Sequence, residues 1–171
     1  STYLALMLIW DIPYYIFPVI ALICNIFVVS GNCFNYIKAG NLNLKLLTPY
    51  LIGSIPLAFF GGSLQIDKNL FEIFLFIVLT LAGTLLLINF KSYDDNESTY
   101  KNVPIFISII IGAILGFVSG VVGVGGGIFL SPILFLIKAA KPKHIVTAAS
   151  LFIFINSISG VTGQLTKNIV L

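Results

Sequence analysis

Glycines crowd one short stretch of this sequence, and their spacing suits the binding of a ligand through the backbone. The run consists of Gly123, Gly125, Gly126 and Gly127. Such a run is costly inside a helix, so one helix should end here and another begin near residues 126–128. The first N–H groups of a helix have no partner within it, and glycine lets a ligand approach them closely. The run therefore predicts a binding site for a small anion.

Amide and hydroxyl side chains in the neighbouring apolar segments could complete this site. All nine basic residues are lysines, so no arginine is available to clamp an anion with two parallel hydrogen bonds. Asn25 and Asn32 share one helical face, and so do Asn156 and Ser159. The candidate side chains are Asn25, Asn32, Ser131, Ser150, Asn156 and Ser159. Hydrogen bonding between helices is the alternative role for the asparagines, because a buried amide in hydrocarbon is costly unless it is paired.

A second set of glycines, Gly112, Gly116 and Gly120, has a different explanation. Residues four apart lie on one face of a helix, so these three leave a bare strip against which a neighbouring helix can pack closely. Packing alone accounts for this set. It does not account for the run at 123–127, to which we assign ligand binding as well as packing.

The composition is that of a membrane protein. Hydrophobic residues make up 58% of the 171 residues, charged residues 9%, and the mean hydropathy is +1.09. Soluble domains carry about 25% charged residues, and a core of this size could not hide so much apolar surface. We expect a multi-pass protein of the cell membrane, in a bacterial or archaeal inner membrane, with the lipid bilayer as its partner. The lysines lie singly between apolar runs, which is typical of loops and speaks against binding to nucleic acid.

Five apolar segments each have about the 20 residues needed to cross roughly 30 Å of hydrocarbon. Their expected bounds are Tyr14–Ile37, Leu46–Leu64, Leu70–Phe90, Val103–Val122 and Ile145–Leu165. A shorter stretch, Ile128–Ile137, would rise only about 15 Å as a helix and cannot span alone. The predicted fold class is therefore all-α and polytopic, with a glycine-broken, discontinuous helix between residues 103 and 137 that folds back on itself.

The chain also matches itself when it is shifted by 129 positions. Pro13 then falls on Pro142, the pair Ser30-Gly31 on Ser159-Gly160, and Lys38 on Lys167. We expect two transmembrane repeats, residues 1–91 and 103–171, joined by a hydrophilic linker at 92–102. The first repeat would lack its own glycine-bearing helix and the second its last spans, as in part of a longer two-repeat protein.

Lysines favour one side of the membrane. The loops at 38–45 and 91–101 lie on the same side after two crossings and together hold Lys38, Lys45, Lys91 and Lys101. The link at 65–69, on the other side, holds only Lys68. Because positively charged loops tend to remain in the cytoplasm, the lysine-bearing side is expected to be cytoplasmic. The fold-back would add the basic loop at 138–144 to it.

Few residues could support catalysis or bind a metal. His144 is the single histidine and falls in a basic loop, while Cys24 and Cys33 fall on opposite faces of one helix. We therefore expect no enzyme activity, no cofactor and no metal. The glycine run does not match a dinucleotide-binding loop either, since no strand pattern precedes it.

The order of these motifs resembles a known family. The run GFVSGVVGVGGGIFLSPIL, followed by AASLFIFINSISGVTG, is similar to the second signature of the sulfite exporter TauE/SafE family of membrane permeases. The first half, from ALICNIFVVSG to KAGNLNLKLLTPYLIGSIPLAFFGG, resembles that family's first repeat. Many members have Thr-Ser where this chain has Ala149-Ser150, and the family's first glycine motif is not in this sequence. The resemblance implies transport of sulfur-containing anions through two repeats related by internal symmetry.

We expect a secondary permease that moves a small sulfur-containing anion, such as sulfite or an organosulfonate, by alternating access around the glycine run. A passive anion channel, or a membrane assembly subunit that transports nothing, is the alternative. Association into a homo-oligomer is left open. Saturable flux stimulated by substrate on the far side would indicate a carrier, whereas linear, conductive flux would indicate a channel.

Overall fold

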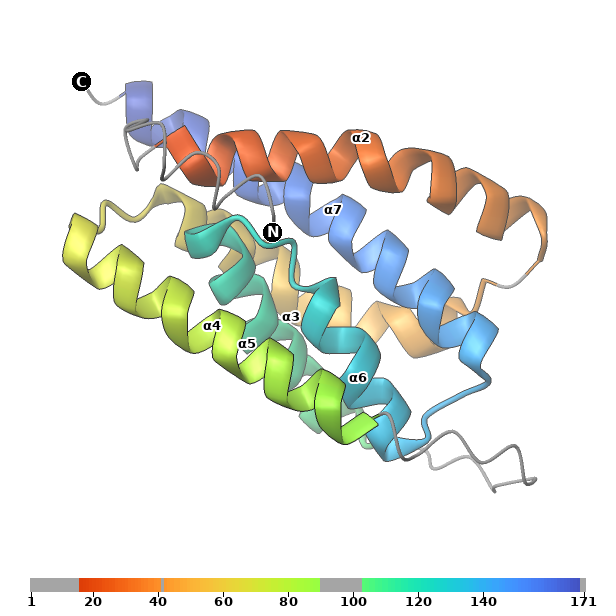
Figure 1. Ribbon diagram of the computed structural model, residues 1–171. Coiled ribbons are helices and arrows are strands. Elements are labelled where there is room, and N and C mark those ends of the chain that lie inside the picture. Colours follow the sequence, from red (N-terminus) through yellow and green to blue (C-terminus); the bar gives the residue numbers. More distant parts are fainter. Residues whose placement is uncertain (1–15, 41, 90–102, 170–171) are drawn as a thin grey trace.

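The protein folds as a bundle of apolar helices (Figure 1). The computed structural model describes residues 16–40, 42–89 and 103–169, and the regular elements within these ranges are helices. They are α2 (Phe17–Lys38), α3 (Leu44–Ser63), α4 (Lys68–Asn89), α5 (Ile105–Val122), α6 (Gly127–Ile137) and α7 (Pro142–Ile169). All of them except α6 are long and apolar enough to cross a membrane. The prediction of an all-α, polytopic protein is confirmed.

The helix ends follow local sequence signals. Pro18 lies in the first turn of α2, where its missing N–H would have had no partner within the helix. The Oδ1 atom of Asn43 accepts a hydrogen bond from the N–H of Leu46 at 3.3 Å and so caps α3. Helix α7 begins at Pro142 rather than at Ile145, because proline suits the first position of a helix. The basic loop before it is therefore shorter than expected.

Helices α5 and α6 form a hairpin that is broken by glycines. Gly123 ends α5 in a left-handed conformation, with φ of 78°, and its N–H donates to the carbonyl of Ser119 at 2.9 Å. Gly125 and Gly126 are also left-handed, with φ of 83° and 66°. These conformations reverse the chain, and α6 runs back toward the start of α5 (Figure 1). The expected break and the expected fold-back are both present.

Helices α3 and α5 pack backbone to backbone along a strip of glycines. A Cβ atom added at any of the three α5 glycines would overlap a carbonyl oxygen of α3: Gly112 faces Tyr50, Gly116 faces Ser54, and Gly120 faces Ala58. Helix α3 contributes small residues in return, since Gly53 lies equally close to the carbonyl of Ile109. The close packing predicted for the α5 glycines is confirmed, and α3 is the partner helix.

Helix α7 closes the bundle by packing against α2 and α3. A Cβ atom at Gly160 would lie 3.0 Å from the Leu22 side chain of α2. On the side that faces α3, the Oγ of Ser159 donates to the carbonyl of Ile55 at 2.7 Å. Figure 1 shows α2 and α7 running in opposite directions, side by side.

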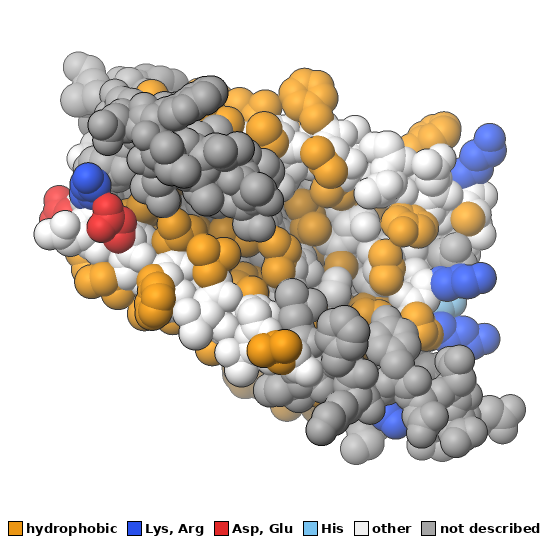
Figure 2. Space-filling view, in the orientation of Figure 1, with side chains coloured by type: hydrophobic (Ala, Val, Ile, Leu, Met, Phe, Trp, Pro, Cys, Tyr) orange, Lys and Arg blue, Asp and Glu red, His pale blue; other side chains and the backbone are white. Residues whose placement is uncertain are grey.

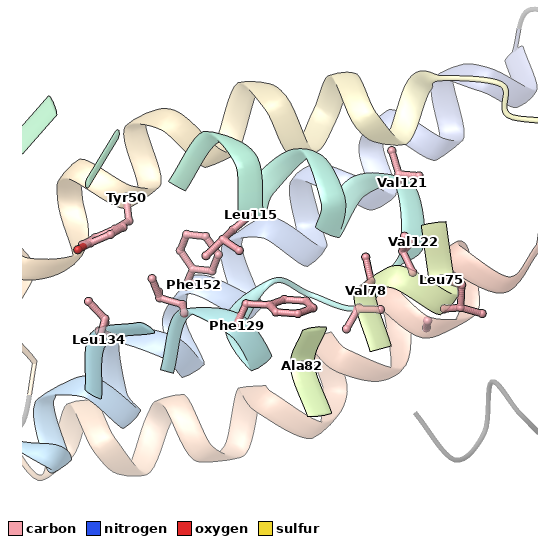
Figure 3. Packing of buried hydrophobic residues seen from close by; sticks show 14 of the residues in the cluster. Tyr50, Leu75, Val78, Ala82, Leu115, Val121, Val122, Phe129, Leu134 and Phe152 are labelled. Atoms are coloured by element: carbon pink, nitrogen blue, oxygen red, sulfur yellow. The ribbon is translucent and has the colours of Figure 1, made fainter. Parts of the chain in front are cut away.

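An apolar core fills the space between the helices, and apolar side chains also cover much of the outside. Phe152 of α7, Leu115 of α5 and Phe129 of α6 are buried together (Figure 3). On the outer faces Phe27 of α2 is 76% exposed and Phe76 of α4 is 71% exposed. Figure 2 shows hydrophobic side chains spread over the visible surface between the two ends. Such a surface fits a lipid environment better than water.

The two ends of the bundle carry different charges. We name as the lysine-rich end the one that holds Lys38, Lys45, Lys138, Lys141 and Lys143, where α2 and α6 end and α3 and α7 begin. Figure 2 shows lysine side chains gathered along this end of the molecule. Among the described residues the two carboxylates, Asp67 and Glu72, lie at the opposite end, with Glu72 3.9 Å from Lys68. The fold-back thus brings the basic loop after α6 to the same end as the loop after α2.

The predicted two-repeat organisation depends in part on residues that the structure does not describe. Residues 1–15 and the linker at 92–102 lie outside the described residues. The division into repeats at 1–91 and 103–171, and the cytoplasmic location of the lysine-rich end, stay predictions.

Candidate functional site

The glycine loop between α5 and α6, residues 123–126, is the centre of the candidate site. All four of its residues are buried. The carbonyl of Gly126 accepts hydrogen bonds from the N–H groups of Phe129 and Leu130 at 3.1 and 3.2 Å, which starts α6. Gly126 has no side chain to cap the helix. The positive end of the α6 dipole therefore faces the loop without a compensating group.

Several N–H groups of this loop are left without acceptors. The N–H of Gly127 turns back to the carbonyl of Gly125 at 2.7 Å. No hydrogen bond joins the N–H groups of Val124, Gly125, Gly126 or Ile128 to another described residue. Buried backbone groups are nearly always paired, so unpaired ones call for water or a ligand. The loop offers hydrogen-bond donors of the kind that an anion needs.

Asn25 is the predicted side chain that contacts this loop directly. Its Nδ2 donates to the carbonyl of Gly123 at 3.3 Å, across from α2 to the end of α5. A Cβ atom at Gly125 would lie 2.9 Å from the same Nδ2. The asparagine thus holds the loop on one side, and both of its predicted roles, pairing between helices and lining a site, fit this position.

Three buried polar side chains of α5 and α7 have no partner within the described part of the chain. They are Ser119, Asn156 and Ser157, each with 0% exposure. A Cβ atom at Gly126 would lie 3.4 Å from Cβ of Ser119, so this hydroxyl adjoins the loop. For Asn156, neither Oδ1 nor Nδ2 has a partner. An unpaired amide inside a membrane bundle is costly and is typical of a functional position.

Asn156 lies on the side of α7 that meets the glycine loop. A Cβ atom at Gly126 would come within 2.9 Å of the Phe152 ring, and Gly127 lies directly against Ile153. Asn156 is four residues after Phe152 and three after Ile153, so it follows them on one helical face. Asn25, Ser119 and Asn156 therefore approach the loop from three different helices, α2, α5 and α7.

The other predicted side chains are distributed around the bundle. Asn32 is exposed, and it lies two turns beyond Asn25 on α2. The Oγ of Ser150 donates to the carbonyl of Val146 in its own helix at 2.9 Å. Ser159 binds α3, as described above, and Ser131 is half-buried in α6. Their proposed part in a site stays a prediction.

The sequence analysis did not name Ser119 or Ser157 as site residues. Ser119 carries a signal, because it falls within the glycine motif, one turn before Gly123. Ser157 is next to Asn156, but the helical period alone does not place it in the bundle interior. The described residues contain no group of three or more histidines, cysteines, aspartates or glutamates that could hold a metal ion.

Helices long and apolar enough to span a membrane, packed around a broken helical hairpin, are typical of a polytopic membrane protein. The sequence profile of the family described as sulfite exporter TauE/SafE matches residues 2–170, and the chain belongs to this family. The resemblance inferred from the motifs is confirmed, and with it the assignment to a multi-pass membrane protein.

Three curated relatives are described as probable membrane transporter proteins. A probable membrane transporter protein, MJ0441 of Methanocaldococcus jannaschii, is 30% identical over 142 residues, which are 79% of this chain and 50% of the relative. The probable membrane transporter proteins y4hK of Sinorhizobium fredii and YunE of Bacillus subtilis are 24% and 25% identical, covering 84% and 82% of this chain and 58% of each relative. The matched part of the chain thus spans 50% to 58% of the length of these relatives. No solved structure shows significant similarity to it.

Proposed function

We propose that this chain forms part of the substrate pathway of a secondary transporter for small sulfur-containing anions, such as sulfite or an organosulfonate. The observation that carries the proposal is the buried glycine loop, whose N–H groups at residues 124–126 have no acceptor among the described residues. The substrate class rests on the family, which is described by its sulfite exporters.

The chemistry of the loop suits such a substrate. The oxygens of sulfite and of a sulfonate head accept hydrogen bonds, and the loop, Ser119 and the amide of Asn156 can donate them. The α6 dipole adds a favourable field at the same point, equivalent to roughly half a positive charge. Glycine at these positions lets the anion reach the backbone, since any side chain at Gly126 would fill the space between Ser119 and Phe152. An anion can thus be bound and released here without a fixed cation beside it.

The broken hairpin also suits alternating access. In many transporters a discontinuous helix carries the substrate site where it is interrupted, and the surrounding helices move about it. Here the interruption packs against helices on either side, with Gly123 close to Pro18 of α2 and Gly127 close to Ile153 of α7. Small shifts of α2 or α7 would open or close the loop.

Flux in proteoliposomes tests the site through Ser119→Ala. This change removes a hydroxyl that has no partner within the described chain and leaves no overlap. We expect the apparent affinity for sulfite to fall about three- to tenfold, as for one lost hydrogen bond, while the melting temperature of the unliganded protein stays the same or rises. Ser63→Ala is the control, because the Ser63 hydroxyl donates to Phe60 within its own helix. Equal sulfite affinity in Ser119→Ala and Ser63→Ala would contradict a site at this loop.

The same vesicles separate a carrier from a channel. A carrier should show saturable uptake that sulfite on the far side accelerates, because the substrate-loaded form reorients repeatedly. Uptake that rises linearly with concentration and carries current would contradict alternating access and would indicate a passive anion channel.

A further inference from the structure

A second feature that could bind a ligand lies at the lysine-rich end of the bundle. It is a cavity of about 270 Å³ between the start of α3, the start of α5 and the segment after α6. Its lining residues are Asn43, Lys45, Leu46, Pro49, Tyr50, Val103, Ile105, Ser108 and Ala139. The 18 residues of α5 rise roughly 27 Å, and the cavity and the glycine loop lie at opposite ends of this helix. The two sites are separate.

Tyr50 provides the evidence that the cavity has an occupant. The residue is only 1% exposed, yet its hydroxyl has no hydrogen-bond partner within the described residues. Figure 3 shows the oxygen directed away from the apolar core that contains Leu115 and Phe152. A buried tyrosine hydroxyl usually finds a partner, so an unpaired one on a cavity wall is a group left for a bound molecule.

Two helices begin at this cavity and supply further donors. The first N–H groups of a helix have no acceptor within it. Helix α5 begins at Ile105 with no side-chain cap, because Pro104 precedes it. Helix α3 is capped by the Oδ1 of Asn43, which leaves the Nδ2 of that side chain as a donor. Both dipoles direct their positive ends toward this end of the bundle.

Among the residues that the structure describes, the charges at this end have one sign. Lys45 lines the cavity, and the other lysines of the lysine-rich end lie at the same end of the bundle. Asp67 and Glu72, the carboxylates among the described residues, lie at the far end of the bundle. Ammonium, tyrosine hydroxyl and uncapped N–H groups are all donors, so they favour an occupant that is an acceptor and is negatively charged.

We infer that this cavity binds an oxyanion of the phosphate or sulfate class. The cavity has room for such a group and several waters, given the roughly 30 Å³ that each water occupies in the liquid. The anion is bound by the Tyr50 hydroxyl, the Lys45 ammonium and the first N–H groups of α5. A free ion and the headgroup phosphate of an anionic lipid present the same oxygens, and both are accessible at the end of a transmembrane bundle. The inference does not depend on transport at the glycine loop.

Inorganic phosphate, titrated at constant ionic strength into the purified protein in a neutral detergent, is the first test. We expect the melting temperature to rise with phosphate concentration and the apparent Kd to increase about tenfold in both Lys45→Gln and Tyr50→Phe. Tyr50→Phe keeps the ring and removes only the hydroxyl, so the fold is retained. Lys143→Gln, an exposed lysine at the same end that does not line the cavity, is the control and should bind as the unmodified protein does. An equal response in all four proteins, or none in any, would overturn the inference.

Nanodiscs distinguish the two sources of the anion. In discs of phosphatidylcholine alone, phosphate should stabilise the unmodified protein at concentrations about tenfold lower than those that stabilise Tyr50→Phe. If the natural occupant is a lipid headgroup, discs that contain phosphatidylglycerol will stabilise the unmodified protein without added phosphate, and added phosphate will have no further effect. If it is a free ion, the phosphate response will persist in both kinds of disc. Ser119→Ala should leave these responses unchanged, so failure here is distinguishable from failure at the glycine loop.

Discussion

Individual polar side chains have two different roles in this bundle. Some bind a carbonyl on another helix: Gln164 Nε2 donates to Gly120 at 3.1 Å, and Lys167 Nζ donates to Leu64 at 2.9 Å. Others, such as Ser119 and Asn156, are buried with no partner in the described chain. The first kind fixes helices to one another. The second kind is costly to the fold and is best explained by a ligand or water.

Lys167 gives a test of the first kind. Leu64 follows the last residue of α3, so its carbonyl is an orphan acceptor that the ammonium satisfies together with the negative end of the helix dipole. Lys167→Met keeps the length of the side chain and removes the charge. We expect a loss of about 1–3 kcal/mol in stability, seen as a lower melting temperature in detergent. Lys143→Met, at an exposed position, should change it little, and an equal effect of both changes would argue against the bond.

At the scale of the helices, the decisive contact is the glycine strip between α3 and α5. Each α5 glycine of the strip lies against a backbone carbonyl, which cannot move aside as a side chain can. This contact also sets the position of the glycine loop, because α5 ends in it. The strip therefore supports the candidate site as well as the fold.

Gly116→Ala tests this contact. The added methyl would overlap the Ser54 carbonyl and lie 2.6 Å from its Cα, so the helices must separate. We expect a destabilisation of about 1–3 kcal/mol or more. Gly83→Ala on α4 is the matched control, since a Cβ atom there meets nothing within 4 Å. It should stabilise the helix by about 0.5–1 kcal/mol, so the two identical substitutions should shift the melting temperature in opposite directions.

The sequence predicted the helices well and their partners poorly. Hydropathy located each of the described helices, and the run from Gly123 to Gly127 located the break, because both depend on local composition. It did not identify α3 as the partner of α5, or the bond from Lys167 to Leu64, because a helical period gives the face but not the neighbour. Asn25 was found because an amide in an apolar run is conspicuous. Ser119 and Tyr50 were missed, because the role of a single hydroxyl depends on its burial and its hydrogen-bond partners, which the sequence does not give.

At the scale of the whole molecule, the helices place five of the described lysines at one end, and the described carboxylates, together with Lys68 and Lys167, at the other. The fold-back of α6 determines this distribution. If α6 continued in the direction of α5, the loop before α7 would lie at the opposite end from Lys38 and Lys45. The hairpin thus makes the chain consistent with positive loops on the cytoplasmic side.

Labelling of single cysteines tests this topology. In a background with Cys24→Ala and Cys33→Ala, we expect Lys38→Cys and Lys141→Cys to be protected from an impermeant maleimide in spheroplasts, and Asp67→Cys to react. All three should react after the membrane is made permeable, which serves as the control. Labelling of Lys141→Cys together with Asp67→Cys in sealed spheroplasts would contradict the hairpin.

The backbone amides of the glycine loop can also report ligand binding in NMR spectra. The amides of Gly125 and Gly126 have no acceptor among the described residues, and so lack the hydrogen bonds that dominate the proton shift of a helical amide. Glycine nitrogens resonate apart from those of other residues, so selective ¹⁵N labelling would reduce a crowded membrane-protein spectrum to the signals of 15 residues. An arriving anion would move the loop amides downfield and leave the helix-packing glycines in place, so occupancy could be followed without a transport assay.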